Sequence, residues 1–365
     1  METLKSINSS NNNESSQLKD KNQNESINDI FKTDEKTNNS SNSSFLENLE
    51  LLEFISTGKC SKVYKSTIGP NKRIVAIKML DTKNVNEINI SKKLKNKNIN
   101  NYYSSYVDEK NKTFNIIMDY AKLGNLRDFQ FKFLEKNYLS ETLLSFITYQ
   151  IISGLKYIHK SKIAHFDIKP QNIVLDEYLN VKIIDFSISI DYNKIKSKTI
   201  KLPIAGTSFY MPPEVLRSDI INTNDLNKVD LYSLGVVLFC AAFGNFPYGL
   251  TQEDAKNYII INEKIEKNKL VIDNEDNYYS SHFISFLKML LEKDINKRIN
   301  LDEALNNYWV KSAEILFDEK EKMYNAGKFL GYLVTDHFKN FDDYIKKGNI
   351  LFGTKKWQFY KIDII

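Results

Sequence analysis

The stretch His165-Phe166-Asp167-Ile168-Lys169-Pro170-Gln171-Asn172 decides how this sequence is interpreted, and Asp185-Phe186-Ser187 begins thirteen positions after its last residue. The first stretch supplies a carboxylate, an ammonium group and a carboxamide, and Asp185 supplies a second carboxylate. Phosphoryl transfer requires little covalent chemistry from a protein, because a carboxylate orients the attacking hydroxyl group and oxygen ligands hold Mg²⁺ on the phosphates. The two stretches contain groups of these types.

Further motifs stand before and after this pair. Val75-Ala76-Ile77-Lys78 has the composition of a strand and ends on a lysine. The stretch from Ser56 to Val63 precedes it and has small serines around one glycine, while residues 87–94 have the spacing of a helix that begins with Glu87. Taken singly, each motif has a plain interpretation: an ordinary strand, a solvated helix charge, or, for Asp185, a turn residue.

Taken together, these motifs resemble the protein kinase family and, in particular, its serine/threonine branch. The segment Gly206 to Glu214 adds a further match, because it resembles the end of the activation loop with proline in place of alanine before Pro213-Glu214. The resemblance implies an α+β, bilobal protein-kinase-like fold with a small antiparallel β N-lobe and a mainly helical C-lobe. It also implies an ATP-dependent protein serine/threonine kinase that acts on Ser/Thr hydroxyl groups of protein substrates.

The resemblance gives four residues a catalytic role. Asp167 is expected to orient the substrate hydroxyl group or accept its proton, and Lys169 to reach the transferred phosphate. Lys78 is expected to hold the α- and β-phosphates, with Glu87 as the carboxylate that keeps its ammonium group aimed. The Lys78 to Glu87 spacing of nine residues is shorter than the family pattern, so the helix is expected to lack its first turn.

The resemblance also implies ATP and Mg²⁺ as cofactors. Asn172 and Asp185 are the expected ligands of Mg²⁺. Met118 is expected at the back of the adenine pocket, followed by a hinge of Asp119, Tyr120 and Ala121. The expected nucleotide-binding residues are Ile55, Ser56, Gly58, Ser61, Val63, Ala76, Lys78, Met118, Asp119, Ala121 and Asn125.

Other patterns predict elements and scaffolding contacts. Alternating residues predict strands over 51–55, 62–68, 73–80 and 114–120, and Ser140 is a predicted N-cap of a helix that ends near His159. The resemblance pairs Glu214 with Arg298, since a buried carboxylate needs a bidentate cation. It also implies that Asp230 accepts backbone N–H groups of the catalytic loop.

Two departures from the family pattern bear on regulation. Phe166 stands where many kinases have the arginine that binds a phosphate on the activation loop, so a phosphate on Ser197 or Thr199 would lose its usual partner. We therefore expect activity that does not require activation-loop phosphorylation. Ser187 replaces the glycine after Asp185-Phe186 and restricts the backbone, which favours a metal-binding conformation.

Composition sets the expected domain organisation of the 365 residues. Residues 1–44 are rich in Asn, Ser, Lys and Glu and are expected to be disordered. Residues 45–310 are the expected kinase domain, with an N-lobe of about 45–120 and a C-lobe of about 121–310, and 311–365 form a C-terminal extension. Its plainest role is added structure on the C-lobe, and a regulatory contact through 311–365 is the alternative.

The same composition bounds partners and location. No basic run with interleaved aromatic residues indicates nucleic acid, despite a net charge of +5. The apolar stretch Leu234 to Phe243 is about half the length of a membrane span and is expected to be a core helix, so no membrane partner is expected. With free thiols at Cys60 and Cys240 and no apolar leader, the expected location is cytoplasmic, with the nucleus not excluded.

Two other classes of function stay open at this point. A nucleotide-binding pseudokinase that serves as a scaffold would explain the single glycine of the Ser56 to Val63 loop and the short Lys78 to Glu87 spacing. The presence of Lys78, Asp167 and Asp185 argues against it. An interaction module in residues 311–365 is the third class, with a helical pattern around 329–345 and a hairpin-like segment after it.

Overall fold

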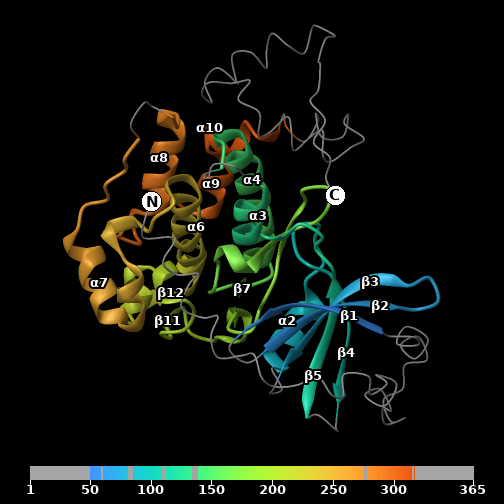
Figure 1. Ribbon diagram of the computed structural model, residues 1–365. Coiled ribbons are helices and arrows are strands. Elements are labelled where there is room, and N and C mark those ends of the chain that lie inside the picture. Colours follow the sequence, from blue (N-terminus) through green and yellow to red (C-terminus); the bar gives the residue numbers. More distant parts are fainter. Residues whose placement is uncertain are drawn as a thin grey trace, which may run out of the picture.

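The computed structural model describes residues 50–58, 61–80, 85–108, 112–133, 139–274, 278–314 and 316. These residues form one lobe around an antiparallel sheet and a second lobe made mainly of helices (Figure 1). The α+β, bilobal fold expected from the sequence is therefore confirmed. The expectations for residues 1–44, and those for the extension beyond residue 316, lie outside the described residues.

The N-lobe consists of a five-stranded antiparallel sheet and one helix. The strands lie in the order β1-β2-β3-β5-β4, with bounds β1 Glu50–Thr57, β2 Ser61–Ile68, β3 Arg73–Leu80, β4 Tyr102–Asp108 and β5 Thr113–Asp119. The helix α2, Val85–Lys93, packs against this sheet (Figure 1).

Side chains on the two faces of strand β3 have different roles. Val75 and Ile77 have no exposed surface and join Ile117 in the core of the lobe. Ala76 and Lys78 occupy the alternate positions, so their side chains project from the opposite face of the strand. A single strand of ordinary β composition therefore fills the core and places a lysine on the face that looks toward the second lobe.

The four strands predicted from the sequence are present, with ends shifted by up to two residues. The fifth strand, β4, was missed, because Tyr102-Tyr103-Ser104-Ser105 mixes aromatic residues with serines and lacks a clear alternation. Its partner β5 determines it, since Ser105 lies opposite Ile116 and Tyr106 opposite Asn115 in the ladder. Helix α2 begins at Val85, two residues before Glu87.

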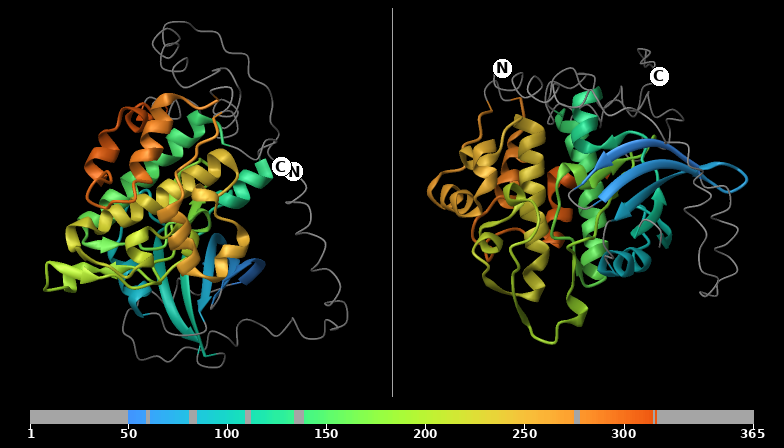
Figure 2. Two further views of the ribbon diagram at one scale, coloured as in Figure 1. Left: turned by 90° about the vertical axis from the view of Figure 1, so that its left-hand side faces the viewer. Right: turned by 60° about the horizontal axis from the view of Figure 1, so that its bottom comes forward.

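The C-lobe is built around two buried helices, α4 (Glu141–Lys160) and α6 (Leu226–Phe243), which lie side by side in Figure 2. Ser140 caps α4 as predicted, since its Oγ accepts a hydrogen bond from Leu143 N. The helices are α3 Leu126–Phe133, α4 Glu141–Lys160, α5 Pro213–Leu216, α6 Leu226–Phe243, α7 Tyr258–Lys267, α8 Ser281–Leu290, α9 Leu301–Asn306 and α10 Tyr308–Lys311.

Helix α6 is long and apolar enough to be tested as a membrane span. Counted with its preceding turn, it covers Thr223–Phe243, longer than the ten apolar residues considered from the sequence, and its most apolar window is 78% buried inside the lobe. This burial is that of a core helix. No other helix in the described ranges has this length and composition.

Short strands hold the loops between the lobes. Strands β6 Gly124–Asn125, β8 Ile173–Leu175 and β9 Val181–Ile183 form one sheet, and β7 Ile163–Ala164 pairs with β10 Ile190–Asp191. Strand β11 Thr199–Lys201 pairs with β12 Ile220–Asn222. Residues 165–172 therefore run between β7 and β8, and Asp185 follows β9 by two positions.

Candidate active site

Lys78 lies between two carboxylates at the base of the N-lobe. Its Nζ is 2.6 Å from Oε1 of Glu87 on α2 and 2.8 Å from Oδ1 of Asp185 after β9. Glu87 is only 3% exposed, which excludes the interpretation of a solvated helix charge. The predicted pair forms despite the short spacing, because α2 starts early enough to bring Glu87 over β3.

The charges in this triad alter one another's pKa values. Burial alone would lower the pKa of Lys78, but Asp185 and Glu87 together outweigh it and raise the pKa above its ordinary value. Burial would also raise the pKa of Asp185, and the Lys78 ammonium group reverses this and lowers the pKa to about 2. Burial raises the pKa of Glu87, an effect that Lys78 partly offsets.

A second cluster surrounds Asp167 in the C-lobe. Lys169 Nζ donates to Asp167 Oδ2 at 2.6 Å and to Thr207 Oγ1 at 2.9 Å. Thr207 N donates to Asp167 Oδ1 at 3.1 Å, and Asn172 Nδ2 donates to Oδ2 at 3.0 Å. Both carboxylate oxygens are therefore fixed by donors from two separate segments.

Asp230 holds the loop that carries Asp167. Its two carboxylate oxygens accept the backbone N–H groups of His165, at 2.9 Å, and Phe166, at 2.8 Å. His159 Nε2 lies 2.6 Å from Asp230 Oδ2, and Asp230 is fully buried. Phe166 has φ of 70°, an uncommon conformation for a residue with a side chain, so these hydrogen bonds hold the loop in a strained backbone.

Phe186 keeps Asp185 directed into the cleft. Its ring is 3% exposed and packs edge to face on the His165 ring, with centroids 5.1 Å apart. The His165 ring also lies with Nε2 2.9 Å from Ile184 O. Asp185 itself has φ of 67°, so its backbone direction depends on this packing.

A cavity of about 440 Å³ between the lobes brings the predicted residues together. Of the predicted site residues, only Asp167 does not line it, and Asp167 is hydrogen-bonded to Lys169 and Asn172, which do. The predicted residues that line it are Ile55, Ser56, Gly58, Ser61, Val63, Ala76, Lys78, Glu87, Met118, Asp119, Ala121, Asn125, Lys169, Asn172 and Asp185.

The donor atoms near Asp185 fit a divalent cation held jointly with phosphates. Lys78 and Ser187 N both bind Oδ1 of Asp185, and Oδ2 has no partner among the described residues. The Asn172 side chain donates through Nδ2 to the backbone and carboxylate oxygens of Asp167, which leaves its Oδ1 for a cation. No group of three or more His, Cys, Asp or Glu side chains in the described ranges could hold a metal alone. One carboxylate and one carboxamide suit Mg²⁺, which takes its other ligands from phosphates and water.

Sequence reasoning missed several residues that line the cavity. Val174 and Ile184 flank the metal-site residues and could have been found from their positions beside Asn172 and Asp185. Thr207 was expected, from the resemblance, to frame the acceptor with Lys169, but it was not among the predicted site residues. Thr57 and Gln171 lie inside stretches that the sequence analysis quoted, but they were not singled out as nucleotide-binding residues, and Tyr120 was named only as part of the hinge. The missed residues for which no local pattern gave a signal are Asn100, Gly124 and Asp128.

A larger hollow, of about 1010 Å³, lies in the C-lobe between the end of α6 and the segment after α7. Six of the fifteen residues that line it are aromatic, and Asp273 is the one carboxylate among the described residues that line it. The volume of a cavity alone therefore does not identify the active site. The smaller cavity carries the paired carboxylates, the buried lysine and the carboxamide.

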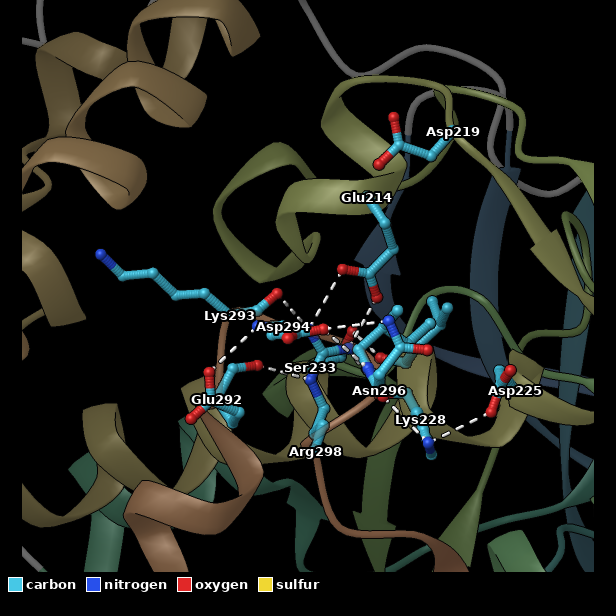
Figure 3. A network of polar contacts seen from close by, with 12 residues as sticks. Glu214, Asp219, Asp225, Lys228, Ser233, Glu292, Lys293, Asp294, Asn296 and Arg298 are labelled. Atoms are coloured by element: carbon cyan, nitrogen blue, oxygen red, sulfur yellow. Dashed lines mark hydrogen bonds and ion pairs between the residues drawn. The ribbon is translucent and has the colours of Figure 1, made fainter.

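The segment that closes the site is anchored deep in the C-lobe. Arg298 Nη1 and Nη2 donate to the two oxygens of Glu214 at 2.6 and 3.1 Å, and both side chains are buried. The guanidinium also donates to the carbonyl oxygens of Glu292, Lys228 and Lys293, so each of its five N–H groups has an acceptor (Figure 3). The predicted bidentate pair is therefore present.

Comparison with known proteins identifies the family of this chain. The model of the protein kinase domain matches residues 49–310, more than two thirds of the chain. The chain belongs to the protein kinase family. It is similar to the serine/threonine-protein kinase pakH of Dictyostelium discoideum, with 33% identity over 73% of this chain and 50% of that protein. It is also similar to the serine/threonine-protein kinase KIC1 of Saccharomyces cerevisiae, with 30% identity over 71% of this chain and 23% of that protein.

A third relative is the MAP kinase kinase MKK1/SSP32 of Saccharomyces cerevisiae, with 27% identity over 84% of this chain and 60% of that protein. The chain thus spans about a quarter to three fifths of the length of these curated relatives. The kinase domain is of the serine/threonine type, as the sequence indicated, and ATP and a divalent metal are the general requirements of this family. The intracellular location stays a prediction.

Proposed function

We propose that this chain is an active serine/threonine protein kinase that transfers the γ-phosphate of ATP to hydroxyl groups of protein substrates. The observation that carries the proposal is the triad of Lys78 with Glu87 at 2.6 Å and Asp185 at 2.8 Å. This triad joins β3, α2 and the segment after β9, which are three separate parts of the chain. A lysine held between two carboxylates is in position to bind phosphates and is kept charged.

The charge of each site residue determines its proposed role in phosphoryl transfer. Lys78 would bind the α- and β-phosphates, and Asp167 would orient the acceptor hydroxyl group and take up its proton. Lys169, bonded to Asp167 and to Thr207, would contact the transferred phosphoryl group near the acceptor. Asn172 Oδ1 and Asp185 Oδ2 would hold Mg²⁺, which supplies charge neutralisation of the phosphates when it is bound.

A comparison of the wild-type chain with Asp185→Asn tests this proposal. The wild-type chain, given Mg-ATP and a generic basic protein, should label the protein, and Asp185→Asn should lose at least a hundredfold of this activity because one metal ligand loses its charge. Asp302→Asn, an exposed residue of α9, should keep full activity as a matched control. Labelling by wild type no stronger than by Asp185→Asn would favour the pseudokinase alternative.

We also propose that activity does not depend on phosphorylation of the activation loop. Phe166 supports this, because its side chain is 5% exposed and packed in the core of the C-lobe, where it offers no cation to a phosphate. Backbone hydrogen bonds hold the activation loop in place of a phosphate contact. Residues Thr199–Lys201 pair with Ile220–Asn222, and Leu202 N donates to Asp219 O at 2.9 Å. This ladder needs no phosphate.

The Ser197→Ala/Thr199→Ala double variant tests phosphate independence. After phosphatase treatment, with mass spectrometry to verify that no phosphate remains, it should keep at least half of the wild-type kcat. Among the described residues, the Ser197 and Thr199 hydroxyl groups hydrogen-bond only within this pair, to each other at 3.3 Å and from Thr199 N to Ser197 Oγ at 3.1 Å, so their loss should not disturb the fold. A loss of tenfold or more, restored by an upstream kinase in the wild-type chain, would contradict the proposal.

For the substrate, we propose no strong preference for arginine before the acceptor residue. Related kinases with this preference use acidic residues where this chain has Asn125, Gln171 and Cys240, none of which is charged. Asp128 is a carboxylate of the same cavity, but its Oδ2 accepts a hydrogen bond from Asn125 Nδ2 at 2.6 Å. A substrate peptide library, run beside a Lys78→Met control, should show less than threefold enrichment of upstream arginine.

A further inference from the structure

Asp119 stands where strand β5 ends and the hinge to the C-lobe begins. Val75 of β3 lies opposite it in the ladder, so the two side chains lie on the same face of the sheet. Ala76 and Lys78, which line the nucleotide cavity, occupy the other face, because successive side chains of a strand point to opposite sides. The carboxylate of Asp119 is therefore on the side of the sheet that does not carry the catalytic lysine.

Three donors from the N-lobe hold this carboxylate. Tyr103 Oη donates to Asp119 Oδ1, and Arg73 Nη2 lies 3.4 Å from the same oxygen. Asn101 Nδ2 donates to Asp119 Oδ2 at 2.5 Å. Arg73 also donates to Tyr103 Oη and lies over the Tyr103 ring, with its Cζ 4.6 Å from the ring centroid. One connected network results, the hinge cluster of Arg73, Asn101, Tyr103 and Asp119.

Burial and main-chain contacts strengthen the hinge cluster. Tyr103 is partly buried against the core of the N-lobe, and the Asp119 side chain is 25% exposed. Burial and the neighbouring Asp119 carboxylate raise the pKa of Tyr103, so its hydroxyl group keeps its proton and stays a donor. Asp119 N also donates to Asn101 O at 3.2 Å, and Asn100 Nδ2 donates to Asp119 O at 3.1 Å. Both the side chain and the main chain of Asp119 are therefore fixed.

The other end of the hinge is fixed in a different way. Leu123 N donates to Leu175 O at 3.0 Å, and Gly124 pairs with Leu175 in the short sheet of the C-lobe. Between the two ends, the Tyr120 ring has its centroid 5.3 Å from Lys65 Nζ on β2. Backbone pairing thus anchors the C-lobe end of the hinge, whereas the hinge cluster is a side-chain anchor at the N-lobe end.

We propose that the hinge cluster positions the edge of the hinge that meets the nucleotide and thereby slows nucleotide release. The inference rests on the proposed use of ATP. It adds Arg73 and Tyr103 as positioning residues, neither of which is among the described residues that line the cavity. Met118 and Ala121, on either side of Asp119 in the sequence, do line it. The end of a strand frays unless it is tied, and a nucleotide that binds a frayed edge has to order it first.

Nucleotide release from the full chain tests the proposal. Displacement of a fluorescent, ribose-labelled ADP by excess ATP would give the dissociation rate, and isothermal titration would give Kd for Mg-ADP. Tyr103→Phe keeps the ring that packs on the core and against Arg73, but it loses the hydroxyl group. The dissociation rate and Kd should both rise about fivefold, because binding then has to order the hinge. KM for the protein substrate should not change.

The neighbouring tyrosine provides the matched control. Tyr102 Oη donates to Ser105 Oγ at 2.7 Å, within β4, and not to Asp119. Tyr102→Phe therefore also loses one hydroxyl hydrogen bond of the same strand, but it should leave the dissociation rate and Kd unchanged. Equal midpoints of urea unfolding for the two tyrosine variants would show that their folds are equally intact.

A second comparison tests whether Tyr103 acts through Asp119. Asp119→Ala removes the carboxylate and keeps the main chain of the hinge. In this background, Tyr103→Phe should not raise the dissociation rate further. An additive rise would show that Tyr103 acts independently of the carboxylate and would overturn the proposal. Should Tyr103→Phe fail to fold, Arg73→Met provides the same comparison, since the Arg73 side chain is 57% exposed.

The outcomes separate this inference from the proposed function. Failure of the folded wild-type chain to bind Mg-ATP and Mg-ADP would overturn the use of ATP and the inference together. Tight binding with equal dissociation rates in wild type and Tyr103→Phe, or an equal rise in Tyr102→Phe, would overturn the role of the hinge cluster alone. A rate that rises in Tyr103→Phe only, and not further in the Asp119→Ala background, supports it.

Discussion

Gly206 shows how one residue controls the fit between the activation segment and the catalytic loop. Its φ is 110°, a conformation that residues with a side chain rarely adopt. A Cβ atom there would lie 3.1 Å from Phe166 O and 3.3 Å from Asp167 Oδ1. Only glycine lets the backbone approach the catalytic carboxylate so closely that Thr207 N can donate to it.

Gly206→Ala should lower both stability and activity. The backbone strain and the close contact should cost about 1–3 kcal/mol of the free energy of unfolding. Displacement of Asp167 should reduce kcat at least tenfold, because catalysis depends on its position. Gly69→Ala is the matched control, since Gly69 also has positive φ but nothing within 4 Å of the added Cβ. It should lose stability with unchanged kcat, and equal losses of kcat in both variants would contradict the assigned role.

The pKa of Asp185 predicts a pH dependence of stability. Its pKa is about 2 in the folded chain, below the ordinary value of 3.8. Because the folded value is the lower one, the carboxylate stabilises the fold fully above about pH 4, and this contribution disappears as the pH falls toward 2. Urea unfolding at pH 6, 4 and 3 should therefore show that the difference in stability between wild type and Asp185→Asn shrinks with acidification. A difference that grows would refute the pKa shift.

At the scale of elements, helix α2 is tied to the segment after β9 by contacts outside the Lys78 triad. Lys93 Nζ lies 3.1 Å from Asp191 Oδ2, and Asn86 Nδ2 donates to Ser189 O at 2.9 Å. The two contacts stand near opposite ends of α2. They hold the helix that carries Glu87 without any phosphate.

Asp191→Asn should weaken the hold on α2. The pair is partly exposed at Lys93, so its loss should cost at most about 1 kcal/mol and lower kcat/KM for ATP about fivefold. Lys93→Met should have the same effect, and the double variant should lose no more than either single one. Lys194→Met is the control, because Lys194 contacts the same carboxylate at 3.5 Å from within its own segment. A fully additive double variant would show that the pair does not act together.

At the same scale, the sequence predicted elements where periodicity or a cap was strong. Ser140 and the apolar spacing after it predicted α4, which begins at Glu141. Strand β4 was missed because its serines have little strand preference, and only pairing with β5 selects an extended conformation for it. The pairing of β11 with β12 joins residues some twenty positions apart, which no local pattern encodes.

At the scale of the whole molecule, one buried ion pair joins the end of the activation segment to the interior of the C-lobe. Glu214 belongs to α5, and Arg298 lies between α8 and α9. Arg298 is 2% exposed and packs over the Tyr232 ring, 4.8 Å from its centroid. The pair therefore links three regions that are far apart in the sequence, and Figure 3 shows how the arginine reaches Glu214.

Arg298→Met should destabilise the domain strongly. It leaves the Glu214 carboxylate buried without a cation, which should cost about 3–5 kcal/mol of the free energy of unfolding, measured in urea. Replacing both residues by methionine should recover part of this loss, because no buried charge remains. Arg217→Met is the control, since Arg217 pairs with Asp219 and Glu266 at the surface and should cost less than about 1 kcal/mol. Equal costs for the two arginines would contradict the buried-pair argument.

The sequence alone determined the fold class and the chemical groups of the active site. Lys78, Asp167, Asn172 and Asp185 were recognisable because they stand in motifs that resemble those of the protein kinase family, and these motifs lie along the chain in the family's order. Alternating or apolar periodicity predicted four of the strands and the helices α2 and α4 in the same direct way, since it depends only on neighbours in sequence.

Only the tertiary structure decided which residues outside the motifs meet at the site. Asn100 donates through Nδ2 to a hinge carbonyl oxygen nineteen residues away, and Lys93 pairs with a carboxylate ninety-eight residues away. Neither residue has a local pattern that distinguishes it from an ordinary surface asparagine or lysine. The physical reason is that hydrogen bonds and ion pairs depend on distance in space, which folding sets and sequence spacing does not.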